Sequence, residues 1–308
     1  MFKRVKTRIL EFRRVRNFIN FTKNNSVPGF EGVPIYEVAY YFKDAILKGS
    51  LSTRSASLAF NFFLALFPAL LFLFTLIPYI PIQGVLDEML FNLNEILPTS
   101  VNEPVMRSLN DLINNEHEGL LIFNIILTLY FASNGIDNLM IQFNSTHLFR
   151  ERRVWWKKRL IAIFLVMLLT VLLVSAVILT SLTKTLFEKV MFEQSFNNSF
   201  TWQLVNLLRW GIAMFLFYLA ISSLYYFGPA KRKNWKFFSV GSSVATLLML
   251  LASSVFAYYI NNFSQYNAIY GSIGTIIIMM LYFQLTSFVL LLGFELNASV
   301  RKGGSLKS

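Results

Sequence analysis

A chain of 308 residues, of which 55% are hydrophobic and only 14% are charged, has too little polar surface to cover a soluble domain of its size. Its formal net charge of +12 would suit a nucleic-acid-binding protein, but the basic residues are spread along the chain rather than gathered in one polar domain. The absence of cysteine excludes disulfides, thiolate catalysis and cysteine-based metal sites. We therefore expect an all-α membrane protein, and no cofactor.

The N-terminal region is basic and amphipathic. Apolar residues recur at steps of three and four from Phe2 to Ile19, with Lys and Arg between them, which predicts a basic amphipathic helix. We expect this helix to lie on the inner membrane surface, while contact with RNA or an acidic partner stays open. A second amphipathic helix is predicted to begin at Pro34 and to end at Gly49. The region lacks the continuous apolar core of a cleavable signal peptide, so none is expected.

Six later segments are long and apolar enough to cross a hydrocarbon core of about 30 Å, which takes about 20 residues. They run approximately over residues 55–79, 119–142, 160–182, 202–227, 237–260 and 270–300. Four Trp residues fall beside their ends, where an indole prefers the headgroup region: Trp155, Trp156, Trp202 and Trp235. The sequence thus predicts a polytopic bundle of six transmembrane helices over residues 55–300. A basic amphipathic region (1–54) precedes it, and a short basic tail (301–308) follows it.

The placement of the basic residues predicts the orientation of these spans. Of the 28 Lys and Arg, 24 lie in four stretches that alternate with the apolar segments: the region to Arg54, residues 150–159, residues 231–236 and the tail from Arg301. Lys and Arg near the ends of spanning helices are retained on the cytoplasmic side. Both termini are therefore expected in the cytoplasm, with membrane lipids of the anionic inner leaflet as partners and no nucleic acid. Whether the chain forms a homo-oligomer stays open.

The connector between the first two spans, residues 83–118, is too polar to cross the membrane. It carries seven carboxylates, and its apolar residues predict two amphipathic helices broken near Pro98. This acidic outer segment is compatible with capping the bundle, with lying on the outer leaflet and with pairing between subunits.

Charged residues within the predicted spans are few. Each costs about 2.5 to 3.5 kcal/mol at the membrane centre on insertion scales, and so calls for a partner or a pathway. Arg54, Asp137 and Glu295 are predicted at a similar depth near the inner ends of the first, second and sixth spans. This inner cluster is compatible with an Arg–carboxylate clamp, with snorkelling to headgroups, or with a gate or proton-linked site. Arg209 lies about two turns into the fourth span from the outer side, where outward snorkelling, pairing with the outer loop and binding of an anionic headgroup all stay open.

Uncharged polar residues within the spans are further candidates for a polar pathway or gate. They are Asn61, Asn134, Gln284 and Asn297. The competing interpretation is packing, because such residues most often form interhelical hydrogen bonds worth about 0.6 kcal/mol each. Pro68 removes a backbone hydrogen bond inside the first span and is expected to kink it. Gly241 and Gly274 are expected to allow close approach of the fifth and sixth spans.

Three runs of the sequence resemble the signatures of a known family. They are RSASLAFNFFLALFP (54–68), FGPAKRKNWKFFSVGS (227–242) and YGSIGTIIIMMLYFQLTSFVLLLGFELNASV (270–300). These runs resemble the first span, a basic linker and the last span of the YihY/BrkB family, once labelled ribonuclease BN. The most specific part is the pattern of Gly293, Glu295, Leu296 and Asn297. The chain departs from the family at Tyr282 and Gln284, where a Trp and an aromatic residue are expected.

The resemblance implies a six-span bacterial inner-membrane protein with cytoplasmic termini. The family has been associated with serum resistance, with a ribonuclease label regarded as a misassignment, and with transport of a lipid A precursor. The last association favours a transporter of a lipid or other amphiphile.

The residues themselves argue against an enzyme. A nuclease needs a general base, a clustered-carboxylate metal site or a pair of histidines within reach of RNA. His117 is predicted outside and His147 inside, and the sequence contains no Walker A loop, nucleophile elbow or HExxH motif. Our main hypothesis is a transporter or flippase for an anionic lipid or other amphiphile, with Arg209 and the inner cluster as polar stations. The alternative is a structural or scaffolding membrane protein whose amphipathic helices and acidic outer hairpin recruit partners.

Overall fold

The computed structural model describes residues 13–76, 118–145, 153–193, 199–230, 235–262 and 272–305, and every regular element in these ranges is a helix. Three predicted features lie outside the described residues: the first turns of the N-terminal helix, the outer segment before Glu118, and both histidines.

The two predicted amphipathic helices before the first span are α2 (Arg13–Asn24) and α3 (Ile35–Lys48). The prediction for α3 is confirmed, with Pro34 as its N-cap and Gly49 as its C-cap. The Gly49 amide donates a hydrogen bond of 2.8 Å to the carbonyl of Ala45, which satisfies one of the carbonyls left free at a helix end. On the surface of α3, the Lys48 ammonium lies 2.7 Å from Asp44, and this hydrogen bond raises the pKa of Lys48.

Each of the six predicted apolar segments is helical over its described part, except that residues 237–239 of the fifth segment precede its helix. The helices are α4 (Leu51–Leu76), α7 (Glu118–Asn144), α8 (Trp155–Glu193), α9 (Ser199–Phe227), α10 (Val240–Asn262) and α12 (Ser272–Ser305). Within the described residues, four stretches are long and apolar enough to cross a membrane: Trp155–Ala176, Asn206–Phe227, Val240–Ile260 and Ile276–Gly304. The number of six spans stays a prediction, because α4 and α7 are not in this set.

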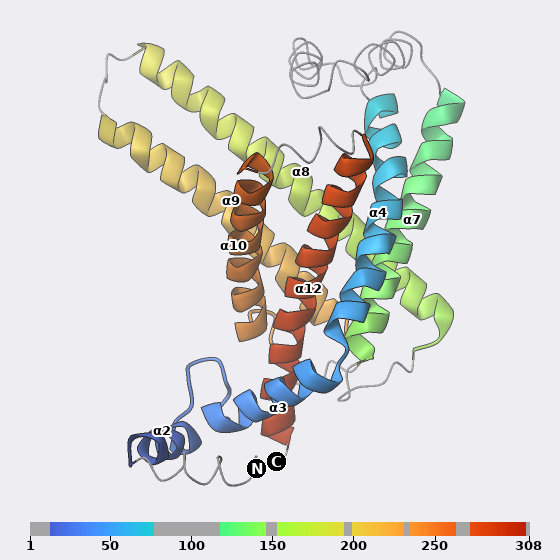
Figure 1. Cartoon of the computed structure of the whole chain (residues 1–308). Coiled ribbons are helices and arrows are strands. Elements are labelled where there is room, and N and C mark those ends of the chain that lie inside the picture. The colour runs from blue at the N-terminus through green and yellow to red at the C-terminus, as the bar shows by residue number, and fades with distance from the viewer. Residues whose placement is uncertain are drawn as a thin grey trace.

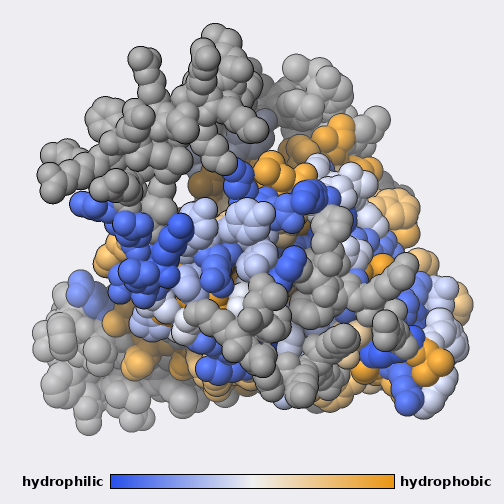
Figure 2. Space-filling model, turned by 90° about the horizontal axis from the view of Figure 1, so that it is seen from below, coloured by the Kyte–Doolittle hydropathy of each residue, from blue (hydrophilic) through white to orange (hydrophobic). Residues whose placement is uncertain are grey.

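The helices pack around α12, which contacts α3, α4, α7 and α10. Helices α8 and α9 pack against each other as a long antiparallel pair that is inclined to α4 and α7 in Figure 1. Helices α2 and α3 and the last turns of α12 lie together at the bottom of the same view, which we call the basal end. Seen from below, hydrophilic residues spread over the middle of this face and hydrophobic residues lie toward its rim (Figure 2).

Buried side chains are concentrated toward the basal end. In α10, Ala245 near the basal start of the helix is fully buried, whereas Leu251, Val255 and Tyr258 farther along are exposed. The same trend holds in α9, where residues 221–225 before its basal end are buried while Leu207, Leu208 and Trp210 are exposed. The halves of these helices away from the basal end thus expose many large apolar side chains. Such a surface favours lipid over water as its surroundings.

A close crossing joins α10 to α12. A Cβ atom on Gly241 would lie 2.3 Å from the carbonyl oxygen of Gly293. A Cβ atom on Gly293 would lie 2.6 Å from both the Cβ atom of Ala245 and the hydroxyl oxygen of Tyr225. The expectation that Gly241 allows close helix approach is therefore confirmed, and its partner on α12 is Gly293.

Candidate functional site

A buried ion pair joins the first and last of the predicted spans at the basal end. The Nη1 atom of Arg54 lies 2.6 Å from Oε1 of Glu295, and the two side chains are only 8% and 1% exposed. Arg54 stands in the first turn of α4, and Glu295 stands three turns before the end of α12. The predicted Arg–carboxylate clamp is therefore formed between these two residues.

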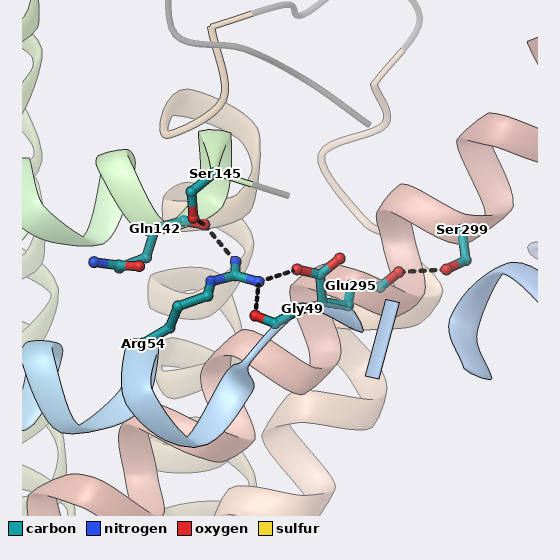
Figure 3. A network of polar contacts seen from close by, with 6 residues as sticks. All are labelled: Gly49, Arg54, Gln142, Ser145, Glu295 and Ser299. Atoms are coloured by element: carbon teal, nitrogen blue, oxygen red, sulfur yellow. Dashed lines mark hydrogen bonds and ion pairs between the residues drawn. The ribbon is translucent and has the colours of Figure 1, made fainter. Parts of the chain in front are cut away.

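Arg54 also contacts two backbone carbonyls from other elements (Figure 3). Its Nη1 atom donates to the carbonyl of Gly49 at 3.3 Å, and its Nη2 atom donates to the carbonyl of Gln142. The planar guanidinium has donors pointing in several directions, so one side chain can tie α4, α7, α12 and the end of α3 together. The ammonium of a lysine could not reach these acceptors in the same geometry.

Asp137, the third member of the predicted inner cluster, lies in a different contact. Its Oδ2 atom is 3.2 Å from Nζ of Lys158 on α8, and the side chains are 22% and 16% exposed. Its Oδ1 atom is buried and has no hydrogen-bond partner among the described residues. The structure thus divides the inner cluster into the Arg54–Glu295 clamp and a second ion pair between α7 and α8.

One turn earlier on α7, Asn134 extends this polar contact between α7 and α8. Its Oδ1 atom accepts a hydrogen bond of 2.5 Å from Nη1 of Arg159. The Arg159 guanidinium also donates to the carbonyl of Tyr130 at 3.3 Å and lies 5.1 Å from the centre of its ring. Tyr130, Asn134 and Asp137 follow one another at steps of four and three, so they lie on one face of α7. We call these three residues with Lys158 and Arg159 the α7–α8 seam.

The basic half of the seam was not among the predicted site residues. The sequence predicts that Lys158 and Arg159 lie in a linker before a span that begins at residue 160, where their charge indicates only the orientation of the span. In the structure α8 begins at Trp155, so both residues lie in its first turns and face α7. Extending the helical pattern of this span back through residues 155–159 would have placed Lys158 and Arg159 on the helix.

Asn297 ties α12 to the start of α10. Its Oδ1 atom accepts a hydrogen bond of 2.7 Å from the Gly241 amide, and its Nδ2 atom donates to Oγ of Ser239 at 2.7 Å. Ser239 and Ser242 also bond to each other around the first turn of α10, with each backbone amide 3.2 Å from the partner's hydroxyl oxygen. Both ends of the Asn297 amide are therefore used in holding the basal start of α10.

The other predicted site residues lie apart from the clamp and the seam. The Asn61 amide donates to the carbonyl of Ser57 in its own helix at 2.9 Å. Gln284 is half-buried on α12 and forms no hydrogen bond with the described residues. Arg209 is also half-buried, lies 6.0 Å from the ring centre of Trp210, and forms no ion pair within the described residues. Its role stays a prediction.

Pro68 lies inside the continuous helix α4. Its carbonyl accepts a hydrogen bond of 2.8 Å from Oγ1 of Thr128 on α7. This bond joins α4 to α7 farther from the basal end than the clamp. The kink expected at Pro68 stays a prediction.

An aromatic stack lies directly beside the clamp. The ring of Phe294, next to Glu295 in sequence, is stacked on Phe143 with centroids 4.1 Å apart and on Trp235 at 5.5 Å. Tyr225 meets both Phe143 and Phe294 edge-on and donates a hydrogen bond of 2.6 Å to the carbonyl of Leu290. These rings fill the space between α7, α9 and α12, so the buried charges lie against a tightly packed apolar wall.

A family model described as "Virulence factor BrkB" matches residues 43–307. The chain belongs to the BrkB family. Among BrkB relatives, the putative ribonuclease-like protein YfkH of Bacillus subtilis is 31% identical over 252 residues, which are 81% of this chain and 90% of that protein. A UPF0761 membrane protein of Mannheimia succiniciproducens is 33% identical over 87 residues, which cover 28% of this chain and 30% of the relative. One of Pseudoalteromonas translucida is 37% identical over 97 residues, with 32% and 31% covered.

No solved structure matches the chain significantly. The family expected from the sequence is nevertheless confirmed, and the chain is a membrane protein of the BrkB family with several apolar helices. Both the clamp and the seam lie inside the matched region.

Proposed function

We propose that this BrkB protein moves a lipid or another amphiphile across the bacterial inner membrane, as a six-span transporter or flippase. The observation that carries the proposal is the contrast along the bundle. At the basal end, the charges of Arg54 and Glu295 are buried between helices beside an aromatic stack, and those of Asp137 and Lys158 are half-buried. Farther along the same helices, large apolar side chains are exposed. Such a molecule offers an amphiphile polar stations for its headgroup and an apolar surface for its chains.

We place the basal end in the cytoplasm. Lys48, Lys158, Lys236 and Arg301 all lie at or near this end, on separate parts of the chain. Retention of basic residues on the cytoplasmic side supports this orientation.

The substrate we propose is anionic. The substrate's nearest surroundings would be the clamp, the seam and Arg153, which donates a hydrogen bond to the carbonyl of Gly228. Together they hold four basic side chains, those of Arg54, Arg153, Lys158 and Arg159, against the two carboxylates of Asp137 and Glu295. The excess of positive charge would attract a phosphate or carboxylate headgroup and would disfavour a cationic one. In this mechanism the clamp closes the cytoplasmic end, and the seam, whose side chains are partly exposed, is the nearest polar station for the headgroup.

The ribonuclease-like name is that of the Bacillus subtilis relative, and for this chain the absence of enzyme activity stays an expectation from the sequence.

The test is reconstitution in liposomes with a fluorescent anionic lipid, whose exposure on the outer leaflet is followed by chemical quenching. We expect translocation faster than in empty vesicles. We also expect Asp137→Asn to slow it, while the matched surface variant Asp44→Asn on α3 leaves it unchanged. Rates equal to those of empty vesicles, with and without a proton gradient, would contradict transport. Preserved cellular activity of a variant that combines Asp137→Asn with Glu295→Gln, at normal membrane levels, would favour the scaffolding alternative.

A further inference from the structure

A small recess, lined in part by Asn297, lies at the basal end. It has a volume of about 60 Å³ and lies between the loop that follows α2, the start of α10 and the last turns of α12. The side chains that matter for its chemistry are Glu31, Trp235, Lys236, Phe238, Ser239 and Arg301. None of them belongs to the clamp or the seam.

The charges in the recess are incompletely matched. One carboxylate, Glu31, lies 3.7 Å from Nζ of Lys236 and 3.6 Å from Nη1 of Arg301. Both distances exceed those of ordinary charge-assisted hydrogen bonds, so Glu31 balances the two cations without bonding closely to either. The Nη2 atom of Arg301 is buried and has no hydrogen-bond partner among the described residues. A buried guanidinium nitrogen in this state indicates an acceptor that the described residues do not supply.

The loop that carries Glu31 is held in an unusual conformation. Glu31 has a φ of 54°, a left-handed value that is uncommon for a residue with a side chain, and Gly29 and Gly32 also have positive φ. A Cβ atom on Gly29 would lie 2.3 Å from a methyl carbon of Val240, the first residue of α10. Tight packing against α10 therefore fixes the loop and holds the Glu31 carboxylate over the two cations.

We infer that this recess binds the phosphate group of an anionic phospholipid at the cytoplasmic membrane surface. Arg301 and Lys236 supply the positive charge, and Glu31 is the internal anion that the phosphate displaces. A phosphate offers more acceptor oxygens than a carboxylate and can bond to a guanidinium through two of them, which would satisfy the buried Nη2 atom of Arg301. The start of the 23-residue helix α10 adds a favourable dipole at the same place.

The walls of the recess favour a lipid over free phosphate as the source of this group. Trp235 and Phe238 line it, and Phe238 is 55% exposed. Aromatic side chains of this kind lie at the level of lipid headgroups, where they pack on the glycerol and the first methylenes. Lys236 is 69% exposed and so can follow a mobile headgroup. The site does not depend on transport activity, because a bound lipid here could equally fix the basal end in the membrane.

The test is binding of a fluorescent short-chain phosphatidylglycerol to the full-length protein in neutral detergent, measured by anisotropy. Unlabelled phosphatidylglycerol, phosphatidylcholine and inorganic phosphate are the competitors. We expect Arg301→Gln to weaken binding about tenfold, equivalent to the loss of one charge-assisted hydrogen bond. Glu31→Gln is expected to strengthen binding several-fold, because the competing internal anion is removed. Lys48→Gln, a basic variant on α3 outside the recess, is expected to bind like the parent chain.

The Glu31 variant keeps the test decisive if Arg301→Gln lowers the amount of folded protein, because a gain in affinity cannot come from unfolding. Unchanged affinity in both the Arg301 and Glu31 variants would overturn the site. If inorganic phosphate displaces the probe as well as phosphatidylglycerol does, the recess binds free phosphate and the lipid assignment is wrong. Displacement by phosphatidylglycerol at least about tenfold better than by phosphatidylcholine supports the anionic lipid.

Discussion

The guanidinium of Arg54 and the carboxylate of Glu295 lie 2.6 Å apart although 241 positions separate them in the chain. Both side chains are almost fully buried, so each helps to compensate the charge of the other. The pair joins the start of α4 to α12 at the basal end, and the Arg54 contacts to the carbonyls of Gly49 and Gln142 extend this joint to the end of α3 and to α7.

Removal of one partner of this clamp should be strongly destabilising. We expect Glu295→Gln to lower the free energy of unfolding by about 3 to 5 kcal/mol, because the buried Arg54 guanidinium loses its carboxylate partner. Arg54→Gln should also lower it, because the change removes the ion pair and both carbonyl contacts of the guanidinium. Arg54→Lys should be little more stable than Arg54→Gln, since an ammonium cannot bond to the same acceptors. The measurement is thermal and denaturant unfolding of the purified protein in detergent. The double variant should lose less than the sum of the two single losses, and strict additivity would show that the two residues do not interact.

The Gly241–Gly293 crossing predicts that two Gly→Ala variants differ sharply in stability. Gly241→Ala should lower the free energy of unfolding by about 1 to 3 kcal/mol, because its Cβ atom would meet the carbonyl of Gly293 and force α10 from α12. Gly211→Ala on α9 is the matched control, since its added Cβ would have no atom within 4 Å outside the neighbouring residues and backbone of its own helix. Equal melting temperatures for the two variants would show that the close crossing is absent.

The α7–α8 seam should respond to charge exchange. Asp137→Lys is expected to destabilise the protein and to impair translocation, and adding Lys158→Asp should recover part of both losses. A coupling of about 0.5 to 3 kcal/mol is usual for residues in direct contact. Lys157 precedes Lys158 in sequence but lies over the ring of Trp156, so Lys157→Asp should give no such recovery. The measurement is a double-mutant cycle on unfolding and on liposome transport. Recovery with Lys157→Asp equal to that with Lys158→Asp would argue against the pair.

The orientation can be tested with single cysteines, because the chain contains none of its own. Lys48 is exposed on α3 at the basal end, and Gln203 is exposed near the start of α9 at the opposite end of its helix. In spheroplasts, a membrane-impermeant maleimide should label Gln203→Cys, and should label Lys48→Cys only after permeabilisation. The reverse pattern would place the basal end outside the cell.

The sequence by itself determined the helices. The apolar length of each segment and local stop signals such as Gly49 are properties of neighbouring residues, and the bounds of α3, α7 and α9 lie within three residues of those predicted. The small residue Gly241 also indicated a close crossing, because backbones approach only where side chains are absent. The sequence could also predict that Arg54 pairs with a carboxylate. A buried charge requires a partner, and few carboxylates were predicted at the depth of Arg54.

The tertiary structure alone decided which faces meet. Arg54 and Asp137 were predicted at one depth, yet they do not pair. Where α7 and α8 pack together, Asp137 pairs with Lys158, and Arg54 pairs with Glu295. The end of α12 was decided in the same way. Two successive glycines would ordinarily stop a helix at residue 303, but the helix continues to Ser305. A Cβ atom on Gly303 would lie 2.4 Å from a methyl carbon of Val33, so packing on the segment before α3 needs a glycine there and stabilises the helix against its own weak propensity. Helix formation depends on local sequence, whereas partners far apart in the chain depend on how the formed helices pack.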